Sequence, residues 1–203
     1  MDNSNMSASF KTCMKILNAL GDLCKEQPYD RISVMEICQR ADVSRSTFYH
    51  HFFGKDDITQ WHSNIIYEAG VDRIGRDLGW FEGHLITTRA FEPYKHIYKA
   101  TSSLENPSGP RTAFVRHRIS VLEETLTEYH HLELTPLLKF QIHAVSVSEA
   151  EESLVWFSGA SPFNNVKEFC RAMESIVPRE LHEAIKNPVE EQNPSMFFAG
   201  TIW

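Results

Sequence analysis

The spacing of hydrophobic and polar residues indicates helices along most of the chain. In the first segment the apolar residues recur three and four positions apart, at Phe10, Cys13, Leu17, Leu20 and Cys24. This is the period of an amphipathic helix, with one face turned to a core. We expect the helix to end before Gln27-Pro28, since the residue that precedes a proline disfavours the helical conformation.

Two short helices joined by a tight turn are predicted next. Ser33 followed by Glu36 is a capping-box pattern that opens a helix. Ser44 is placed to cap another helix that runs to about His51. Asp42 and Val43 make the break between them, and aspartate tolerates the left-handed conformation that such a turn requires.

The rest of the chain is also helical in period. A longer helix is expected from Asp56-Asp57 to about Leu78, and others near 84–104, 111–129, 136–158, 164–177 and 179–186. Sustained alternation of apolar and polar residues, which is typical of strands, is not seen. The sequence therefore predicts an all-α fold.

Composition narrows the class of protein. The 203 residues are 42% hydrophobic and 23% charged, which is typical of folded domains. No apolar run approaches the length of a membrane span, and the start MDNSNMSASF lacks the features of a signal peptide. The four cysteines are too few for a disulfide scaffold and are expected to be reduced and buried, in a cytoplasmic protein. Because the first three lie on apolar stripes, core packing is favoured over a redox sensor.

Charge is distributed unevenly along the chain. The net charge is −7, yet residues 1–55 hold seven Lys and Arg against six Asp and Glu. Acidity of the whole chain argues weakly against nucleic-acid binding. A local positive surface can still bind DNA, because the potential at the contact is what matters.

The two short helices and their turn have the geometry of a helix-turn-helix, whose second helix enters the major groove of DNA. No acidic residue lies between Val43 and Lys55, and nearly every residue from Ser44 to His51 carries a polar group. Hydroxyls, imidazoles and a guanidinium are the groups that contact phosphates and base edges. Phe48 is the apolar exception and would hold the helix to the core.

The stretch ISVMEICQRADVSRSTFYHHF, residues 32–52, continued by Gly54-Lys55-Asp56-Asp57-Ile58, resembles the DNA-binding signature of TetR-type transcriptional regulators. The resemblance covers roughly residues 9–62. It implies a helix-turn-helix DNA-binding domain at 1–55 and a helical effector-binding and dimerisation domain at 56–203. The implied function is that of a homodimeric regulator of double-stranded operator DNA, a repressor that a small-molecule effector releases.

The resemblance also implies roles for single residues. Thr47, Tyr49, His50 and Lys55 would hold phosphates, Ser33 would meet a phosphate at a helix N-terminus, and Arg45 and Ser46 would contact bases. The full predicted DNA-binding set is Ser33, Ser44, Arg45, Ser46, Thr47, Tyr49, His50 and Lys55.

Two positions depart from the family pattern. Many relatives have glycine where this chain has Asp42 and Ser46. A side chain at residue 46 would reach toward the groove and change base preference. Lys11 is the only basic residue before Lys15, so minor-groove contacts by an N-terminal arm are not expected.

The larger C-terminal part is rich in aromatic residues and histidines, as small-molecule sites often are. An ordinary helical core with hydrogen-bonded histidines is the alternative. The hypothesis of an aromatic or amphipathic effector rests on eight candidate residues: His84, Phe91, Tyr94, Phe114, His117, Phe140, His143 and Trp156.

Catalysis and metal binding are not expected. No nucleophile–base pattern and no glycine-rich phosphate loop occurs, so we predict neither an enzyme nor a cofactor. His130-His131 with Glu133 could hold a metal. Adjacent helical residues point in different directions, however, and the sequence favours no metal site.

A protein that contacts DNA through one short helix usually acts as a dimer. The helices at 136–158 and 164–177 could supply an isologous four-helix interface. An apolar stripe predicts the contact surface, although a core within one chain explains it as well: Val166, Phe169, Cys170, Met173, Ile176 and Val177.

The competing hypothesis is a helical protein–protein interaction module that does not bind DNA. The acidic net charge and the poorly basic N-terminal segment favour it slightly. Salt dependence of duplex binding separates the two classes, because phosphate contacts release counterions.

Overall fold

The computed structural model describes residues 7–101 and 109–186, and these are helical nearly throughout. An isolated bridge between Ile74 and Leu78 is the sole β-type pairing among them. None of the helices in this part of the chain combines the length and hydropathy that crossing a bilayer would require. The all-α prediction is therefore confirmed.

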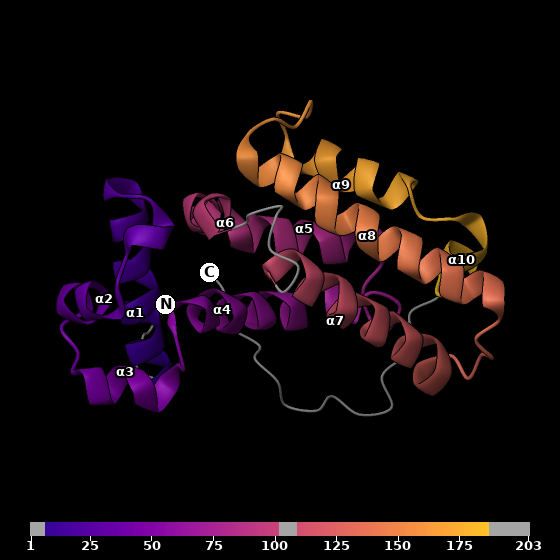
Figure 1. Cartoon of the computed structure of the whole chain (residues 1–203). Helices are drawn as coiled ribbons and strands as arrows, with labels where there is room; N and C mark the ends of the chain where they lie inside the picture. The colour runs from indigo at the N-terminus through magenta and orange to yellow at the C-terminus, as the bar shows by residue number, and fades with distance from the viewer. Residues whose placement is uncertain (1–6, 102–108, 187–203) are drawn as a thin grey trace. The chain divides into compact units, whose positions relative to one another are not determined.

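The elements follow one another as shown in Figure 1. In chain order they are α1 (Ala8–Glu26), η2 (Tyr29–Arg31), α2 (Val34–Ala41), α3 (Arg45–His51), α4 (Lys55–Ala69), η3 (Val71–Arg73), α5 (Trp80–Phe91), η4 (Glu92–Tyr94), α6 (Lys95–Thr101), α7 (Pro110–Glu124), the π-helical turn η5 (Thr125–Tyr129), α8 (Pro136–Ser158), α9 (Val166–Ser175) and α10 (Arg179–Ala184).

The chain forms two compact units. The first comprises residues 1–64 and 94–103, and the second comprises 65–93 and 104–203. The division therefore falls inside α4 rather than at residue 55, and α6 returns to the first unit. Residues 187–203, a tail whose role the sequence does not indicate, lie outside the described part.

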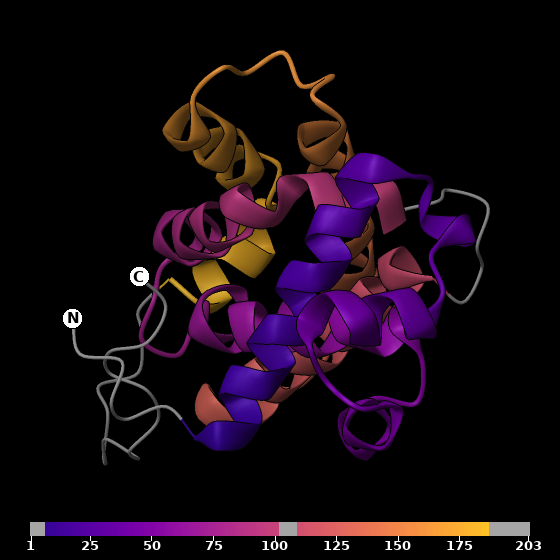
Figure 2. The ribbon, with the colours of Figure 1, turned by 90° about the vertical axis from the view of Figure 1, so that its left-hand side faces the viewer.

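The first unit is built around α1, which packs against α2 and α6 (Figures 1 and 2). Ile16, Leu17 and Leu20 of α1 are completely buried, as is Phe48 of α3. Leu17 and Leu20 are stripe positions that the three-four spacing predicted, whereas Ile16 is an additional buried position. α1 ends at Glu26, as expected before Gln27-Pro28. The predicted short helices α2 and α3 are also confirmed.

Two apolar clusters can be described in the second unit. One gathers residues of η3, α5, α7, η5, α8 and α10, with Leu122, Leu126 and Ile142 at full burial. The other joins Trp156 of α8 to three residues of α9. Figure 1 shows α7 alongside α8. α9 packs against α5, and these two pairs make most of the helix–helix contact within the second unit.

The prediction that the fourth helix continues to Leu78 is wrong. α4 ends at Ala69, because Gly70 brings the backbone against α5, where a Cβ at residue 70 would collide with Thr87. The N–H of Val71 then donates to the Thr87 hydroxyl at 3.0 Å instead of continuing the helix. A glycine is needed for this close approach.

The single helix expected at 84–104 is also wrong. α5 begins earlier, at Trp80, and ends at Phe91; η4 and α6 follow as separate elements. Pro93 lies at this break, and a proline has no N–H to donate to the preceding turn. The break is where the chain passes from the second unit back to the first.

The four cysteines are all free thiols. Cys13, Cys38 and Cys170 are buried, as predicted, whereas Cys24 is half-buried. Burial raises the pKa of all four thiols, that of Cys170 to about 11. Since the thiolate is the reactive form, this favours core packing over redox sensing.

Candidate functional site

The helix-turn-helix begins with a complete capping box at α2. The Ser33 hydroxyl accepts from the Glu36 N–H at 3.3 Å, and the Ser33 N–H donates to Glu36 Oε2 at 2.8 Å. Hydrogen bonds from the Ser33 side chain and backbone, and then from Gln27, lower the pKa of Glu36 to about 2. A carboxylate therefore occupies this helix N-terminus, and Ser33 donates to it from both its N–H and its hydroxyl.

The turn between the two helices depends on Asp42. Its φ of 52° and ψ of 52° are left-handed, as the sequence predicted for this position. The Val43 N–H donates to the Cys38 carbonyl at 3.0 Å, which closes the end of α2. The chain then turns directly into the cap of α3.

Ser44 caps α3 and organises its first turn. Its Oγ accepts from the Thr47 N–H at 3.0 Å and lies 2.7 Å from Ser46 Oγ and 2.8 Å from Thr47 Oγ1. Phe48 is completely buried and Phe52 is 3% exposed, so the helix is anchored through one side.

The opposite side of α3 is exposed and free of acidic groups. We call it the α3 face; it consists of Ser44, Arg45, Ser46, Tyr49 and His50, with Thr47 half-buried beside them. The Arg45 guanidinium lies 5.9 Å from the centre of the Tyr49 ring. The structure thus brings six of the eight predicted DNA-binding residues together on one short helix and its cap; their role stays a prediction.

Lys55 is used differently from the prediction. Its ammonium donates to the carbonyls of Tyr29 at 2.8 Å, Ile32 at 3.0 Å and Asp30 at 3.4 Å. It also lies 4.3 Å from the centre of the Tyr29 ring. An ammonium has three N–H donors, and all three have partners here. Lys55 therefore fastens α4 to the η2 segment, and the phosphate contact is not supported by this geometry.

The N-terminus of α4 is likewise occupied by the chain itself. Asp57 Oδ2 accepts the Phe53 N–H at 2.7 Å, and Asp56 Oδ1 accepts the Tyr29 hydroxyl at 2.5 Å. Two carboxylates in this first turn satisfy the helix dipole. The same charges oppose a phosphate at this end.

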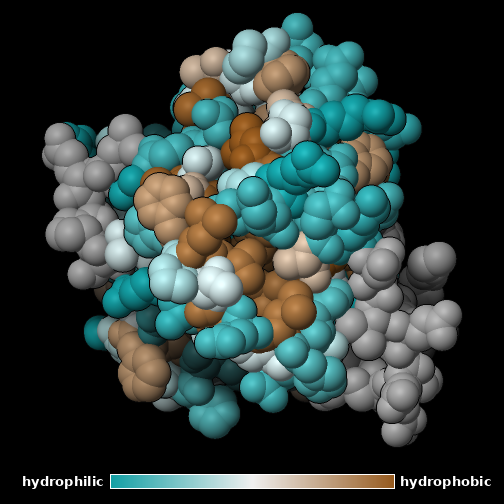
Figure 3. Space-filling view, turned by 90° about the vertical axis from the view of Figure 1, so that its right-hand side faces the viewer, coloured by the Kyte–Doolittle hydropathy of each residue, from teal (hydrophilic) through white to brown (hydrophobic). Residues whose placement is uncertain are grey.

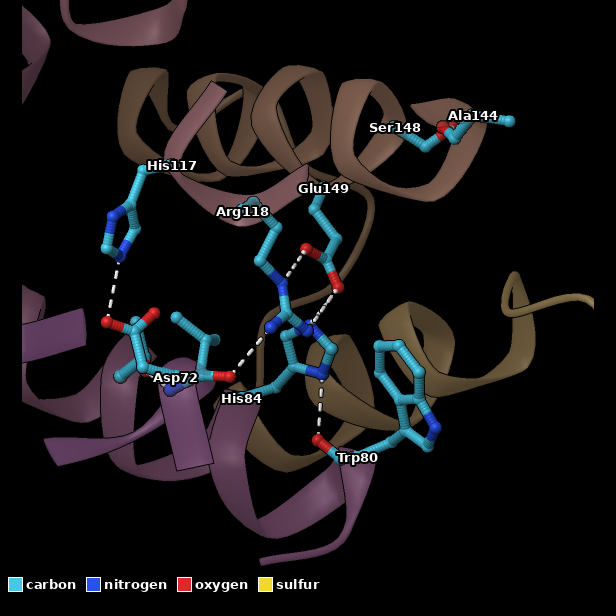
Figure 4. Close-up of polar contacts among 10 residues, drawn as sticks. Asp72, Trp80, His84, His117, Arg118, Ala144, Ser148 and Glu149 are labelled. Atoms are coloured by element: carbon cyan, nitrogen blue, oxygen red, sulfur yellow. Dashed lines mark hydrogen bonds and ion pairs between the residues drawn. The ribbon is translucent and has the colours of Figure 1, made fainter. Parts of the chain in front are cut away.

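In the second unit, a cluster of ionised groups crosses the interior (Figure 4). Arg118 Nε donates to Glu149 Oε2 at 2.8 Å, Arg118 Nη1 to the Val71 carbonyl at 2.7 Å, and His84 Nε2 lies 3.0 Å from Glu149 Oε1. Arg118, Glu149 and His84, which we call the buried ionic cluster, are 0%, 1% and 4% exposed. Through these contacts the cluster connects α7, α8 and α5 to one another and to the η3 turn.

The charge of Glu149 is maintained by its neighbours. Burial alone raises its pKa, but the Arg118 charge and the hydrogen bonds from His84 and Arg118 outweigh it and lower the pKa to about 2. Beside the cluster, His117 Nε2 contacts Asp72 Oδ2 at 2.8 Å (Figure 4). A buried salt bridge of this kind needs its hydrogen bonds complete, because desolvation of the ions is costly.

Arg118, Glu149 and Asp72 are residues that the sequence analysis missed. The spacing of the sequence could have identified two of them. Arg118 lies four residues from both Phe114 and Leu122, and Glu149 lies four residues after Val145, so each shares a helix face with apolar residues. An ionisable residue on an apolar stripe of each of two helices indicates a buried pair.

The predicted effector residues are only partly brought together. His84, Phe91 and Trp156 are buried in the second unit, and Phe114 and His117 are half-buried. Tyr67 links Phe91 and Phe114, with ring centres 5.7 Å and 5.1 Å away.

Three effector candidates lie elsewhere. Phe140 is 70% exposed and His143 is exposed, since both lie on the outer side of α8. Tyr94 belongs to the first unit and contacts the His62 ring at 4.4 Å. None of these three lies in the interior of the second unit.

The predicted dimer stripe is mostly internal. Phe169, Cys170 and Met173 pack beneath Trp156, whose ring stacks on Phe169 at 4.7 Å, and Val177 is buried in the other cluster. The stripe faces the unit's own core because α9 lies against α5.

Two residues of the predicted dimer set differ from the rest. Val166 is half-buried and Ile176 is 42% exposed. For the four buried members, an interface role is contradicted by their burial within one chain.

The predicted metal alternative also has no geometric support. The His130 ring contacts the Gly75 carbonyl at 2.5 Å, and His131 is exposed with a φ of 53°. Within residues 7–101 and 109–186, no group of three or more His, Cys, Asp or Glu side chains is arranged to hold a metal ion.

Comparison with known proteins gives the same assignment as the helix-turn-helix. Residues 16–60, from α1 into α4, match the family described as "Bacterial regulatory proteins, tetR family". The chain is 37% identical over 95 residues to the HTH-type dhaKLM operon transcriptional activator DhaS of Lactococcus lactis subsp. lactis (strain IL1403). That match covers 47% of this chain and about half, 51%, of the relative.

Comparison with solved structures gives two matches that each cover most of this chain. One is the dihydroxyacetone kinase operon activator DhaS, with a TM-score of 0.61 and 19% identity over 86% of this chain and 96% of that one. The other is the TetR family repressor AlkX from Dietzia sp. strain DQ12-45-1b, with a TM-score of 0.48 and 13% identity over 84% and 97%. Residues 16–60, which hold the capped helix-turn-helix, are therefore similar to the TetR family of bacterial regulatory proteins.

Proposed function

We propose that the chain is a transcriptional regulator that binds double-stranded operator DNA through the α3 face. The observation that carries this proposal is an exposed, acid-free set of donors on a helix fixed by a cap and two buried phenylalanines. Such donors contact phosphates and base edges, and a rigid helix presents them in one register. The comparisons give no support to the alternative of an interaction module without DNA binding.

Selection of bound duplexes from a random library tests this proposal. The selected duplex should bind the full chain with an affinity that falls as salt rises. Arg45→Ala should relax the preference at one base position, a loss of about 1–3 kcal/mol of discrimination. Arg116→Ala is the matched control, because Arg116 is an exposed arginine on α7. If the library yields no preferred duplex and binding ignores salt, the proposal is wrong.

The direction of control is proposed to be repression, as the sequence analysis expects, whereas the Lactococcus lactis relative is named an activator. A promoter–reporter fusion carrying the selected duplex measures it directly. Arg45→Ala should raise the reporter signal if the bound chain represses and lower it if the chain activates. Arg116→Ala should leave the signal unchanged in both cases.

The proposed regulator acts as a homodimer in the cytoplasm. Since the α9 stripe is internal, we place the interface on the outer face of α8, where Leu137 and Phe140 are 53% and 70% exposed. Figure 3 shows apolar residues gathered on the side of the second unit where α8 begins. Isologous contact of such a face is the usual way to form a C2 dimer.

Light scattering tests the dimer. Phe140→Glu should give a folded monomer, and the neighbouring exposed Lys139→Ala should leave the dimer intact. Phe169→Glu is expected to unfold the second unit instead, because its ring is 3% exposed and stacked on Trp156. A wild-type chain that is monomeric at micromolar concentration contradicts this part of the proposal.

The proposed signal is a small aromatic or amphipathic molecule bound by the second unit. Rings of Tyr67, Phe91, Phe114 and Phe157 meet there at 5.1–5.7 Å, which offers an apolar surface for such a ligand. Thermal-shift screening of aromatic compounds should find one that raises the melting temperature and weakens operator binding. A compound that raises the melting temperature but leaves operator binding unchanged is not the effector.

A further inference from the structure

Phe53 is the most exposed large apolar side chain of the described residues. Its exposure is 95%, although the preceding Phe52 is 3% exposed. The described part of the first unit has two other exposed large apolar or aromatic side chains, Met35 of α2 and Tyr49 of α3. All three lie on the helix-turn-helix or directly after it, where a partner would cover them.

The position of Phe53 relative to α3 is fixed. Its N–H donates to Asp57 Oδ2 at 2.7 Å, and the Phe52 N–H before it donates to the Phe48 carbonyl at 2.9 Å. The backbone is therefore held on both sides while the ring extends into solvent. An apolar ring held in this way is preorganised for a contact.

The surroundings of Phe53 disfavour an ionic contact. The Lys55 ammonium donates hydrogen bonds to three carbonyls, and Asp56 and Asp57 place two carboxylates in the same turn. The turn therefore offers no free donor to a phosphate, whereas the uncharged C–H surface of a deoxyribose needs none. A lone ring among polar neighbours is also unlike the contiguous apolar patch that a protein partner requires.

We propose that Phe53 packs against a deoxyribose of the operator strand beside the C-terminal end of α3; this inference rests on the proposed DNA binding. In a helix-turn-helix the N-terminal residues of the second helix contact base edges. Phe53 lies two residues beyond the last residue of α3, His51, so it meets the strand that borders the groove. Its contact adds affinity without a charge and helps to set the register of the helix.

The test compares variants on the library-selected duplex over a range of salt concentrations. Phe53→Ala should weaken binding about tenfold, with an unchanged slope against salt, because the ring neutralises no phosphate. Phe53→Leu, which keeps an apolar side chain, should recover part of the loss. Since the ring is 95% exposed in the free chain, the melting temperature should stay the same for both variants.

Hydroxyl-radical footprinting provides the direct readout, because these radicals attack deoxyribose. The wild-type chain should protect one or two sugars at the edge of each half-site, and Phe53→Ala should expose them. Replacing nearby thymidines by deoxyuridine, which lacks the methyl group, should not change the affinity of the wild-type chain. If this replacement weakens binding of the wild type but not of Phe53→Ala, the ring contacts a thymine methyl and the sugar contact is overturned.

The two proposals fail in different ways. If Phe53→Ala binds as tightly as the wild type while Arg45→Ala loses base preference, the Phe53 contact is wrong and the proposed function stands. If the wild-type chain selects no duplex, the proposed function fails and the Phe53 contact fails with it. If Phe53→Ala dissociates a dimer, the ring contacts protein and the sugar assignment is overturned.

Discussion

The helix-turn-helix and the interior of the second unit are stabilised in opposite ways. In the first, polar contacts join residues three or four apart, as between Ser33 and Glu36 or Ser44 and Thr47. In the second, the buried ionic cluster joins His84, Arg118 and Glu149. Local contacts shape a surface that faces outward, whereas the long-range cluster fixes how helices pack.

This difference predicts where the molecule is most sensitive to substitution. Loss of a local cap leaves groups that water can reach and typically costs about 1 kcal/mol. Removal of one partner from a buried ion pair leaves an unpaired charge without water and costs more. The comparison can be tested by removing each kind of contact in turn.

Arg118→Met is expected to have the largest effect. It leaves the buried Glu149 carboxylate with His84 as its one remaining partner in the buried ionic cluster, and it removes the donor to the Val71 carbonyl. The free energy of unfolding should therefore fall by about 3–5 kcal/mol. Urea unfolding followed by circular dichroism measures it. Arg116→Met, an exposed position on the same helix, is the matched control. Equal stability of the two variants would show that the cluster is not structural.

Removing Arg118 and Glu149 together separates the effect of the unpaired charge from that of lost packing. Arg118→Met combined with Glu149→Leu leaves no unpaired ion between α7 and α8, and apolar replacements of a buried pair are often neutral. The double variant should therefore recover most of the stability that Arg118→Met loses. A double variant as unstable as the single one would mean that packing volume, and not charge, is responsible.

The pH dependence of stability should follow Glu149. Its pKa is about 2 in the folded chain against an ordinary value of 4.5, so its contribution is present above 4.5 and is lost as pH falls toward 2. The loss is about 3 kcal/mol for a shift of this size. Unfolding free energies measured across that window should fall further for the wild type than for the Arg118→Met, Glu149→Leu double variant. Parallel curves would contradict the prediction.

Lys55→Ala tests a long-range polar contact of the helix-turn-helix, the one from the Lys55 ammonium to the η2 segment. Three carbonyls would lose their charged donor, and the free energy of unfolding should fall by about 1–3 kcal/mol. Lys15→Ala, an exposed lysine of α1, is the control. If stability is unchanged and the salt slope of duplex binding falls by about one instead, Lys55 contacts a phosphate after all.

The sequence was sufficient where the determinants are close together in the chain. The capping box at Ser33, the left-handed turn at Asp42 and the cap at Ser44 each depend on residues within five positions, and all three are confirmed. The all-α fold class and the resemblance to TetR-type regulators followed from these elements.

The sequence was insufficient where the partner is distant or where one pattern fits two partners. The end of α4 depends on the approach of Gly70 to Thr87, and the use of Lys55 depends on carbonyls more than twenty residues earlier. The stripe through Phe169 has the same period whether it faces another subunit or the core of its own. Periodicity identifies an apolar face but not what covers it.

The smallest predicted effect concerns Asp42, where the local rule itself can be examined. A residue other than glycine at φ 52° is strained, although aspartate tolerates this region better than alanine does. Asp42→Ala should therefore lower the unfolding free energy by about 1 kcal/mol. Asp42→Gly relieves the strain but makes the unfolded chain more flexible, so its stability should lie within about 0.5 kcal/mol of the wild type. Thermal unfolding of the wild type and the two variants gives the order of their stabilities. Gln39→Ala, at an exposed position on α2, controls for the loss of a polar side chain. Equal stability of Asp42→Ala and Asp42→Gly would show that the left-handed turn does not constrain residue 42.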